Sequence, residues 1–202
     1  MNSPALYLWF DTEYTDLEFK RARLLQVAAI ITDSNLKRLL PPEYDVVLPI
    51  KLNPRGKFSD WVKTNIPHLL EVCASERAVE ETVADHLLSS YIDKTLRQGG
   101  LGNIPPCLAG NSVHIDWWLA EKYLPQFSRR LHYRHLDVTA FKLEWLRLHP
   151  AEEFPKENSS LIRKYFPEAC LKETENRHDA YYDLQASIAE FAFYREKLLS
   201  PL

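Results

Sequence analysis

Residues 6–10 read Leu-Tyr-Leu-Trp-Phe, and the chain then runs straight into Asp11-Thr12-Glu13. A short apolar run rich in aromatic residues is typical of a buried strand. Side chains alternate between the two faces of a strand, so Asp11 and Glu13 share one face and Thr12 points away from it. The stretch therefore predicts a buried strand that carries two carboxylates to one site.

Two further stretches add residues of the same kind. Asp116 lies near the middle of the chain, and His178 and Asp183 lie near its end. Four carboxylates and one histidine suit a site for two divalent ions held about 3.5–4 Å apart, which cancel the charge of a phosphodiester. Oxygen ligands favour hard ions such as Mg2+ and Mn2+. Because an imidazole titrates near about pH 6.5, the histidine is suited to take a proton from the attacking water.

The spacing of His178 and Asp183 predicts where each residue lies. A helix turns about 100° per residue, so in one continuous helix the two side chains would lie about 140° apart. We therefore expect Asp183 in the first turns of a helix and His178 on the loop before it. The apolar face of that helix consists of Leu184, Ile188, Phe191 and Leu198.

The rest of the chain reads as a mixed sheet covered by helices. Residues 6–51 fit two or three consecutive antiparallel strands. Residues 59–73 look helical, with a break or kink at Pro67. Short strands are predicted at residues 107–109 and 136–138, with a helix over residues 116–123 between them. A further helical stripe consists of Val79, Val83, Leu87 and Tyr91.

Four motifs, in order along the chain, resemble a known family. They are Phe10-Asp11-Thr12-Glu13-Tyr14-Thr15, then Ala109-Gly110-Asn111-Ser112-Val113-His114-Ile115-Asp116, then His132-Tyr133-Arg134-His135-Leu136-Asp137-Val138-Thr139, and finally His178-x-Ala180-x-x-Asp183. Over roughly residues 5–199 the chain resembles the DEDD-type 3′→5′ exonucleases of the histidine subclass, and within them the oligoribonuclease family. The resemblance implies an α/β, ribonuclease H-like fold (DnaQ-like exonuclease fold), with a mixed five-stranded sheet flanked by helices.

The resemblance also implies an activity and a metal site. Oligoribonucleases hydrolyse very short RNA, down to dinucleotides, and release 5′-mononucleotides. By this resemblance His178 would be the catalytic base and the cofactors would be two divalent metal ions, Mg2+ or Mn2+. Their ligands would be Asp11, Glu13, Asp116 and Asp183.

Substrate contacts follow from the same resemblance. The family wedges the bases between a leucine and a tryptophan, which match Leu17 and Trp61. It works as a homodimer, and Tyr133 matches a tyrosine that the partner subunit contributes in trans. A cap around the 5′ phosphate limits the substrate length, and its matching residues are Ser112, Arg134, Thr139 and His178. The expected partner is therefore short RNA.

Several positions depart from the family pattern. Tyr14 and Asp16 stand where Met and Gly are usual, and Ile115 stands where Gln is usual. Trp117-Trp118 replaces residues that are commonly basic. The expected site is less cationic and more aromatic than the family norm, which bears on affinity and preferred length more than on the chemistry.

Composition agrees with this interpretation. With 202 residues, 46% hydrophobic and 26% charged, the chain suits one globular exonuclease domain, residues 1–202. A formal charge of −3 suits short substrates better than long nucleic acid. Three cysteines without metal spacing argue against a disulfide framework. No run approaches the roughly 20 apolar residues of a membrane span, and no signal peptide is apparent, so we expect a cytoplasmic protein that binds no membrane.

Alternative interpretations stay open at this stage. The chain could be an exonuclease that trims longer DNA or RNA 3′ ends, or a non-catalytic module that binds RNA ends or a protein partner. The complete set of ligands and base argues against the binding module. Trp61 could equally be a core anchor, and we expect Trp117 and Trp118 to pack against protein rather than stack on bases.

Overall fold

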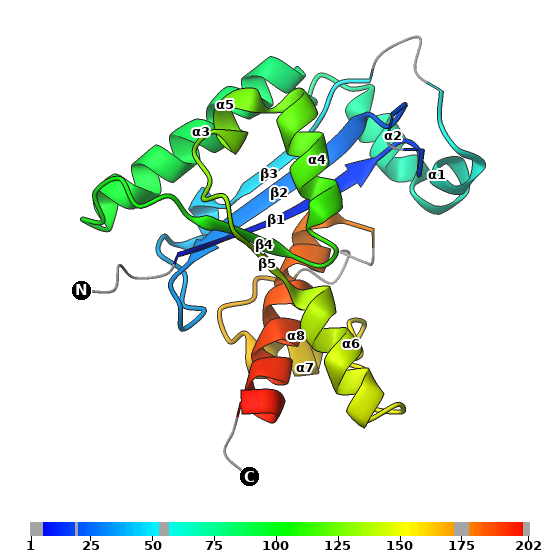
Figure 1. Cartoon of the computed structure of the whole chain (residues 1–202). Helices are drawn as coiled ribbons and strands as arrows, with labels where there is room; N and C mark the ends of the chain where they lie inside the picture. The colour runs from blue at the N-terminus through cyan, green and yellow to red at the C-terminus, as the bar shows by residue number, and fades with distance from the viewer. Residues whose placement is uncertain (1–5, 19, 53–56, 172–177, 200–202) are drawn as a thin grey trace.

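Five strands form one mixed sheet in the order β3-β2-β1-β4-β5 in the computed structural model, which describes residues 6–18, 20–52, 57–171 and 178–199 (Figure 1). β1 (Tyr7–Tyr14) lies at its centre, antiparallel to β2 (Leu24–Thr32) and parallel to β4 (Cys107–Gly110). β3 (Val46–Pro49) pairs antiparallel with β2, and β5 (His135–Asp137) pairs parallel with β4. The predicted fold is confirmed, including three antiparallel strands within residues 6–51.

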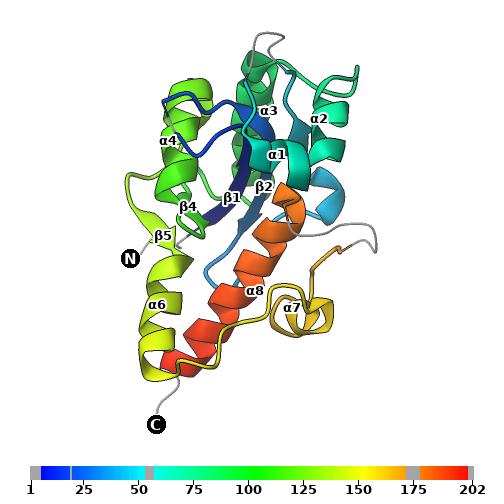
Figure 2. The ribbon, with the colours of Figure 1, turned by 90° about the vertical axis from the view of Figure 1, so that its right-hand side faces the viewer.

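Helices cover both faces of this sheet, so that α4 and α8 lie on opposite sides of it (Figure 2). The helices α3, α4 and α5 pack together on one face, and α6 and α8 pack on the other. The short helices α1 and α2 lie beside β2, and α7 packs against α8. Their bounds are α1 (Asp60–Asn65), α2 (Pro67–Cys73), α3 (Glu81–Gln98), α4 (His114–Tyr123), α5 (Pro125–Ser128), α6 (Val138–Leu148), α7 (Ser159–Tyr165) and α8 (Ala180–Leu199), and a 3-10 turn spans Pro42–Tyr44.

Alternation along β1 separates two hydrophobic cores. Leu8 and Phe10 belong to the core beneath α3, α4 and α5. Trp9 belongs to the core beneath α6 and α8, where its ring lies against Phe191. By the same alternation Asp11 follows Trp9 toward the α8 face, which is the face from which Asp183 comes. The strand therefore delivers its carboxylates where the sequence predicts.

The buried face of α3 differs from the prediction. The expected stripe is confirmed at Tyr91 but is wrong at Val83 and Leu87, which are 45% and 40% exposed. Ala84, Leu88 and Ile92 are buried beside Tyr91 in their place. Val79 lies before the helix, in an isolated bridge with Ile50. Apolar residues lie on more than one face of α3, so its sequence is compatible with two rotations of the helix about its axis. Packing in the structure corresponds to the rotation that buries Leu88.

Capping side chains and Pro67 set other boundaries. Pro67 begins α2 at its first turn, so the predicted break falls between α1 and α2, at Ile66. The last strand ends at Asp137, one residue earlier than expected, because its side chain accepts a hydrogen bond from the Thr139 amide and starts α6.

Within the described ranges, every helix is too short or too polar to cross a membrane.

Candidate active site

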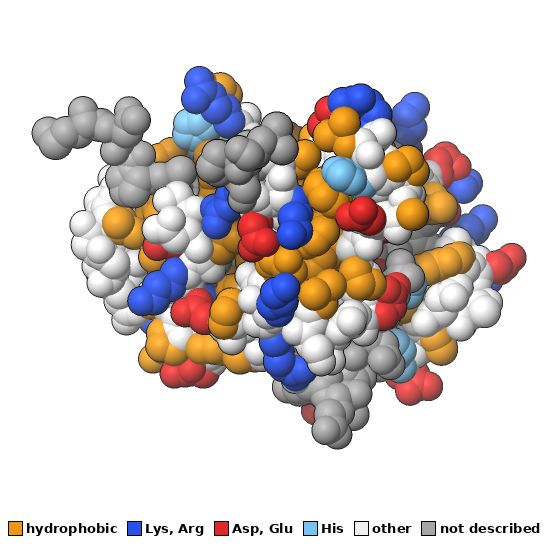
Figure 3. All heavy atoms as spheres, turned by 90° about the horizontal axis from the view of Figure 1, so that it is seen from below, with side chains coloured by type: hydrophobic (Ala, Val, Ile, Leu, Met, Phe, Trp, Pro, Cys, Tyr) orange, Lys and Arg blue, Asp and Glu red, His pale blue; other side chains and the backbone are white. Residues whose placement is uncertain are grey.

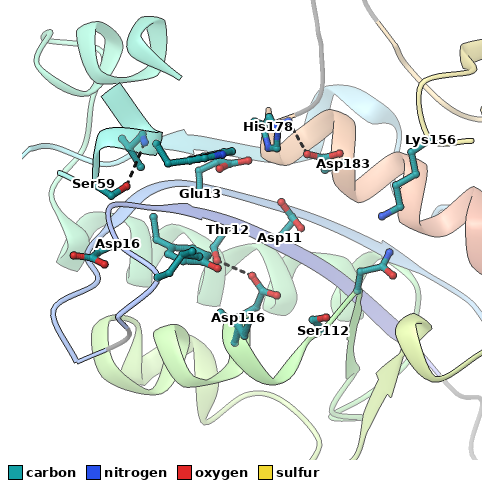
Figure 4. A pocket seen from close by; sticks show the side chains of 16 residues that line it. Asp11, Thr12, Glu13, Asp16, Ser59, Ser112, Asp116, Lys156, His178 and Asp183 are labelled. Carbon is teal, nitrogen blue, oxygen red and sulfur yellow. Dashed lines mark hydrogen bonds between the residues drawn. The ribbon is translucent and has the colours of Figure 1, made fainter. Parts of the chain in front are cut away.

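A pocket of about 540 Å3 lies at the end of β1, between α4 and the start of α8. The five residues predicted for catalysis and metal binding all line it, although they come from three distant segments. Figure 4 shows the carboxylates of Asp11, Glu13 and Asp183 directed into the same space, with Asp116 opposite. The residues concerned are Asp11, Glu13, Asp116, His178 and Asp183.

Thr12 is part of this site, which the sequence interpretation missed. Alternation does point Thr12 away from Asp11 and Glu13, but the opposite face is where α4 brings Asp116. The Thr12 hydroxyl donates a hydrogen bond of 2.6 Å to Asp116 Oδ1. A strand therefore holds the Asp116 carboxylate from one side while the helix carries it from the other.

His178 precedes α8, and Asp183 lies in its first turn, as predicted. The backbone of His178 has a φ of 68°, in the left-handed region that residues other than glycine seldom adopt. Its amide donates a hydrogen bond of 2.8 Å to Asp183 Oδ2. The ring lies edge-on to Trp61, with centroids 4.8 Å apart. These contacts hold the imidazole at the rim of the carboxylate cluster, and strain of this kind is typical of functional positions.

Burial and mutual repulsion favour the protonated, neutral forms of the acidic side chains in the pocket. Burial raises the pKa of Glu13 to about 8, and the nearby Asp183 carboxylate adds to the effect. Loss of hydration, followed by the charges of Asp116 and Asp183, raises the pKa of Asp11 well above its usual range. Burial raises the pKa of Asp116 to about 7, although the hydrogen bond from Thr12 lowers it. Such a cluster gains from a cation that replaces the protons.

The donor set fits a divalent metal ion. Glu13, His178 and Asp183 each offer one ligand atom, and these atoms lie within 4.8 Å of one another. Asp11 and Asp116 add carboxylates in the same pocket. A site made mainly of carboxylate oxygens is the environment that Mg2+ and Mn2+ prefer.

Three of the six residues predicted to bind substrate line the pocket, namely Leu17, Trp61 and Ser112. Leu17 is 77% exposed and Trp61 is 46% exposed. The core-anchor alternative for Trp61 is therefore wrong. Both apolar side chains are free to contact a base at this end of the pocket.

Ser112 is held in place by Thr139, the fourth of these six residues. The Ser112 amide donates hydrogen bonds to Thr139 Oγ1 (2.8 Å) and to Asp137 Oδ1 (3.0 Å). Ser112 has a left-handed φ of 50°. The turn starts at Gly110, where a Cβ would meet the Phe10 carbonyl oxygen at 2.9 Å, so only glycine lets β4 end this close to β1. Thr139 therefore lies behind Ser112 rather than on the pocket wall.

Tyr133 and Arg134 do not line the pocket within this chain. Tyr133 is 76% exposed, and its ring stacks on His132 with centroids 4.5 Å apart. The Arg134 guanidinium lies over the Tyr133 ring at 5.2 Å. Both side chains project from the connection between α5 and β5.

The departures from the family pattern fall partly inside the pocket. Tyr14, Asp16 and Ile115 line it. The negative charge of Asp16 is partly offset by Arg21, 3.4 Å away, and its other oxygen accepts the Glu18 amide. The Trp117–Trp118 pair lies outside the pocket lining in the described part of the chain, and Trp117 packs against His135 with centroids 4.7 Å apart.

Asn111 and Lys156 also line the pocket and were not predicted as site residues. Asn111 lies in the second motif, so its position was a usable signal. Lys156 lies between α6 and α7, where the sequence carries no motif. Nothing in its spacing from the other site residues points to the pocket.

Carboxylates and a histidine gathered at the end of the central strand of a ribonuclease H-like sheet define a metal-dependent hydrolase of phosphodiesters. Comparison with known proteins agrees. The exonuclease (RNase T) family matches residues 8–191. The oligoribonuclease of Coxiella burnetii is 30% identical over 199 residues, covering 96% of this chain and 94% of its own. The mitochondrial oligoribonuclease of Bos taurus is 32% identical over 195 residues, covering 95% of this chain and 72% of its own.

Solved structures share the fold. Exonuclease I of Escherichia coli, in a zinc-bound complex with single-stranded DNA, superimposes with a TM-score of 0.63 at 15% identity. Exonuclease I of Methylocaldum szegediense gives 0.59 at 21% identity. Each comparison covers 97% of this chain but only 41% of the exonuclease I chain. The chain belongs to the exonuclease family, as an oligoribonuclease-like DEDD exonuclease, and is therefore a nuclease.

Proposed function

We propose that this nuclease is a 3′→5′ exoribonuclease that hydrolyses short oligoribonucleotides, down to dinucleotides, to 5′-mononucleotides. The observation that carries the proposal is one pocket of about 540 Å3 that contains both the carboxylate cluster and the base-wedge candidates Leu17 and Trp61. A pocket of this size is large enough for a small ligand such as a dinucleotide. The names of the relatives described above support RNA as the substrate.

The side chains that line the pocket follow one another in an order that suits a short nucleotide chain. A base would lie against Leu17 and Trp61, gaining about 1–3 kcal/mol from stacking on the aromatic ring. The scissile phosphate would lie over Asp11, Glu13, Asp116 and Asp183. When bound there, two Mg2+ or Mn2+ ions would cancel the charge of the phosphate and of the carboxylates.

His178 is the proposed general base. Its imidazole lies at the rim of the carboxylate cluster, held through its amide by Asp183 and through its ring by Trp61. In its neutral form it accepts a proton from the water that attacks the phosphate in line. The P–O bond to the leaving 3′ oxygen then breaks and a 5′-mononucleotide is released.

Around the 5′ phosphate, Ser112 is proposed to contact the substrate, with Thr139 holding Ser112 in place and Arg134 approaching from outside the pocket lining. Tyr133 is proposed to act from the partner subunit of a homodimer. Its 76% exposure, and its absence from the residues that line the pocket in its own chain, support a role toward another molecule. Figure 3 shows hydrophobic side chains gathered on the face seen from below. On α6, Leu143 and Leu148 are 63% and 50% exposed. Exposed apolar surface of this kind supports the proposed homodimer.

A single comparison of substrates tests this function. We would measure mononucleotide release from a 5′-phosphorylated diribonucleotide and from a seven-nucleotide RNA, each with Mn2+ and with EDTA. Fast, chelator-sensitive cleavage of the dinucleotide and slow cleavage of the longer RNA is the expected result. Preference for the longer RNA would move the function to trimming of 3′ ends. Cleavage of neither would leave a module that binds RNA ends.

A further inference from the structure

Gln26 on β2 lies beside the acidic pair of β1 but outside the lining of the pocket. It is paired directly with Glu13 across the two antiparallel strands, so the two side chains share one face of the sheet. Gln26 is only 6% exposed. A buried amide side chain is stable where its donors and acceptors have partners, so the partners of Gln26 indicate what it does.

The side-chain amide of Gln26 bonds to the two residues that follow His178. Gln26 Oε1 accepts a hydrogen bond of 2.9 Å from the Ala180 amide. Gln26 Nε2 donates one of 3.3 Å to Asp179 Oδ2. An amide side chain offers a donor and an acceptor together, whereas a carboxylate only accepts. The glutamine therefore matches a backbone N–H and a carboxylate at the same time.

Asp179 in turn links Gln26 to the start of α8. Its other oxygen, Oδ1, accepts hydrogen bonds from the amides of Tyr181 (3.0 Å) and Tyr182 (3.2 Å). The amides of the first helical turn have no acceptor within the helix, so Asp179 caps α8 at its N-terminus. One carboxylate thus joins the sheet to the first turn of the helix.

His178 depends on these contacts more than the helix does. Its φ of 68° lies in the left-handed region, a conformation that persists only where the surrounding structure holds it. Its own amide is bonded to Asp183 (Figure 4), and the two residues after it are held by Gln26. The helix has further support, because Leu184 and Ile188 are buried in the core. Loss of the Gln26 contacts should therefore move His178 and leave Asp183 in place.

We propose that Gln26 is a positioning residue for the reaction, because it holds the segment after His178 so that the imidazole stays at the rim of the carboxylate cluster. The proposal rests on the proposed role of His178 as the general base. Gln26 acts through the histidine and contacts neither the substrate nor the metal ions. A carboxylate at position 26 would face Asp179 with a like charge, so an aspartate at position 179 requires the amide.

Turnover of the 5′-phosphorylated diribonucleotide in Mn2+ tests this role. Gln26→Met is similar in length and leaves the Ala180 amide without its acceptor. It should lower kcat by about 10- to 100-fold, as loss of a group that orients a site residue does. KM should change by less than about 3-fold, because the groups that bind the substrate are unchanged. Gln26→Glu should lower kcat by at least the same factor, because two carboxylates then face each other.

A reciprocal exchange separates the hydrogen bonds from the packing. In Gln26→Glu combined with Asp179→Asn, the amide and the carboxylate change places. The carboxylate at position 26 still accepts from the Ala180 amide, and it accepts from the amide at position 179, whose oxygen remains as the helix cap. This double variant should recover kcat to within about 5-fold of wild type, because the two changes compensate each other. A double variant no more active than Gln26→Glu would overturn the proposal.

Gln185→Met is the matched control. Gln185 on α8 is also a buried glutamine, and its Oε1 likewise accepts a hydrogen bond from a backbone amide, that of Cys170 (2.6 Å). Both Gln→Met variants should lower the thermal unfolding temperature. Gln185→Met should leave kcat within about 3-fold of wild type, because its loss acts on stability. An equal loss of kcat in the two variants would mean that Gln26 serves the fold and not the histidine.

The His178→Ala background shows whether the glutamine acts through the histidine. In that background Gln26→Met should lower kcat by less than about 3-fold, because two residues that act as one unit are not additive. The full loss in both backgrounds would overturn the proposal, because the glutamine would then act on the metal ligands or on the fold.

Hydrogen exchange of the Ala180 amide, measured by NMR, tests the contact without turnover. Exchange should be at least about 10-fold faster in Gln26→Met than in wild type and unchanged in Gln185→Met, because only the first variant removes the acceptor. Unchanged exchange in Gln26→Met would refute the positioning contact itself. Turnover that His178→Ala leaves unaffected would instead refute the proposed base, so the two failures are distinguishable.

Discussion

Replacing Glu13 with Gln is expected to stabilise the metal-free protein, and more strongly at pH 8 than at pH 5. Glu13 is only 9% exposed and faces the carboxylates of Asp183, Asp179 and Asp116. Burial raises its pKa to about 8, while a glutamate in the unfolded chain has a value of 4.5. Between these two pH values the folded state holds a proton that the unfolded state has lost. The free energy of unfolding therefore falls as the pH rises through this window.

The size of the effect follows from the two pKa values. One pKa unit corresponds to about 1.4 kcal/mol. If Glu13 titrated alone, its contribution would cost about 1 kcal/mol at pH 5 and about 4 kcal/mol at pH 8. Neighbouring carboxylates share part of the proton, so we expect Glu13→Gln to show at least about half of that difference, roughly 2 kcal/mol.

Urea unfolding in EDTA measures this difference directly. Wild type, Glu13→Gln and the control Glu121→Gln, which changes an exposed glutamate on α4, would be compared at pH 5 and pH 8. Adding Mn2+ at pH 8 should reverse the order, because the cation stabilises the wild-type carboxylates more than the amide. If Glu13→Gln were equally stable relative to wild type at both pH values, or less stable at pH 8, the reasoning from buried like charges would be refuted.

Three further substitutions test other parts of the site. Thr12→Val removes the 2.6 Å hydrogen bond to Asp116 and should lower the affinity for Mn2+ about 10-fold or more, as measured by calorimetric titration. Thr12→Ser keeps the hydroxyl and is the control. No loss of affinity in Thr12→Val, or an equal loss in Thr12→Ser, would contradict a role for the hydroxyl. His178→Ala should lower kcat by about 100- to 10,000-fold with dinucleotide binding mostly retained, and unchanged single-turnover rates would remove this histidine from the mechanism. Trp61→Ala should raise KM by about 5- to 100-fold through lost stacking; if the control Trp118→Ala, which changes a ring outside the pocket, did the same, the wedge role would fail.

Much of the fold and site could be predicted because their signals are local. The apolar run before Asp11 and its period of two residues indicate both a strand and the face that its carboxylates share. The spacing of five residues between His178 and Asp183 places one on a loop and the other on a helix, and the structure confirms this arrangement. Within α3 the prediction was wrong for Val83 and Leu87, because these two residues are as apolar as the residues that are buried. Periodicity alone could not choose the rotation that places Leu88 against the sheet.

The sequence by itself indicated the family and the class of enzyme, because the residue types of each motif, and the strand that carries the first acidic pair, are local features. Only the tertiary structure decided which other side chains share the pocket. Thr12 was expected to face away, and it does, but α4 brings Asp116 to that same face. Lys156 reaches the pocket because α8 fixes it through Tyr182 and Glu190. A contact between residues so far apart in the chain depends on packing, and the spacing of these residues in the sequence does not predict it.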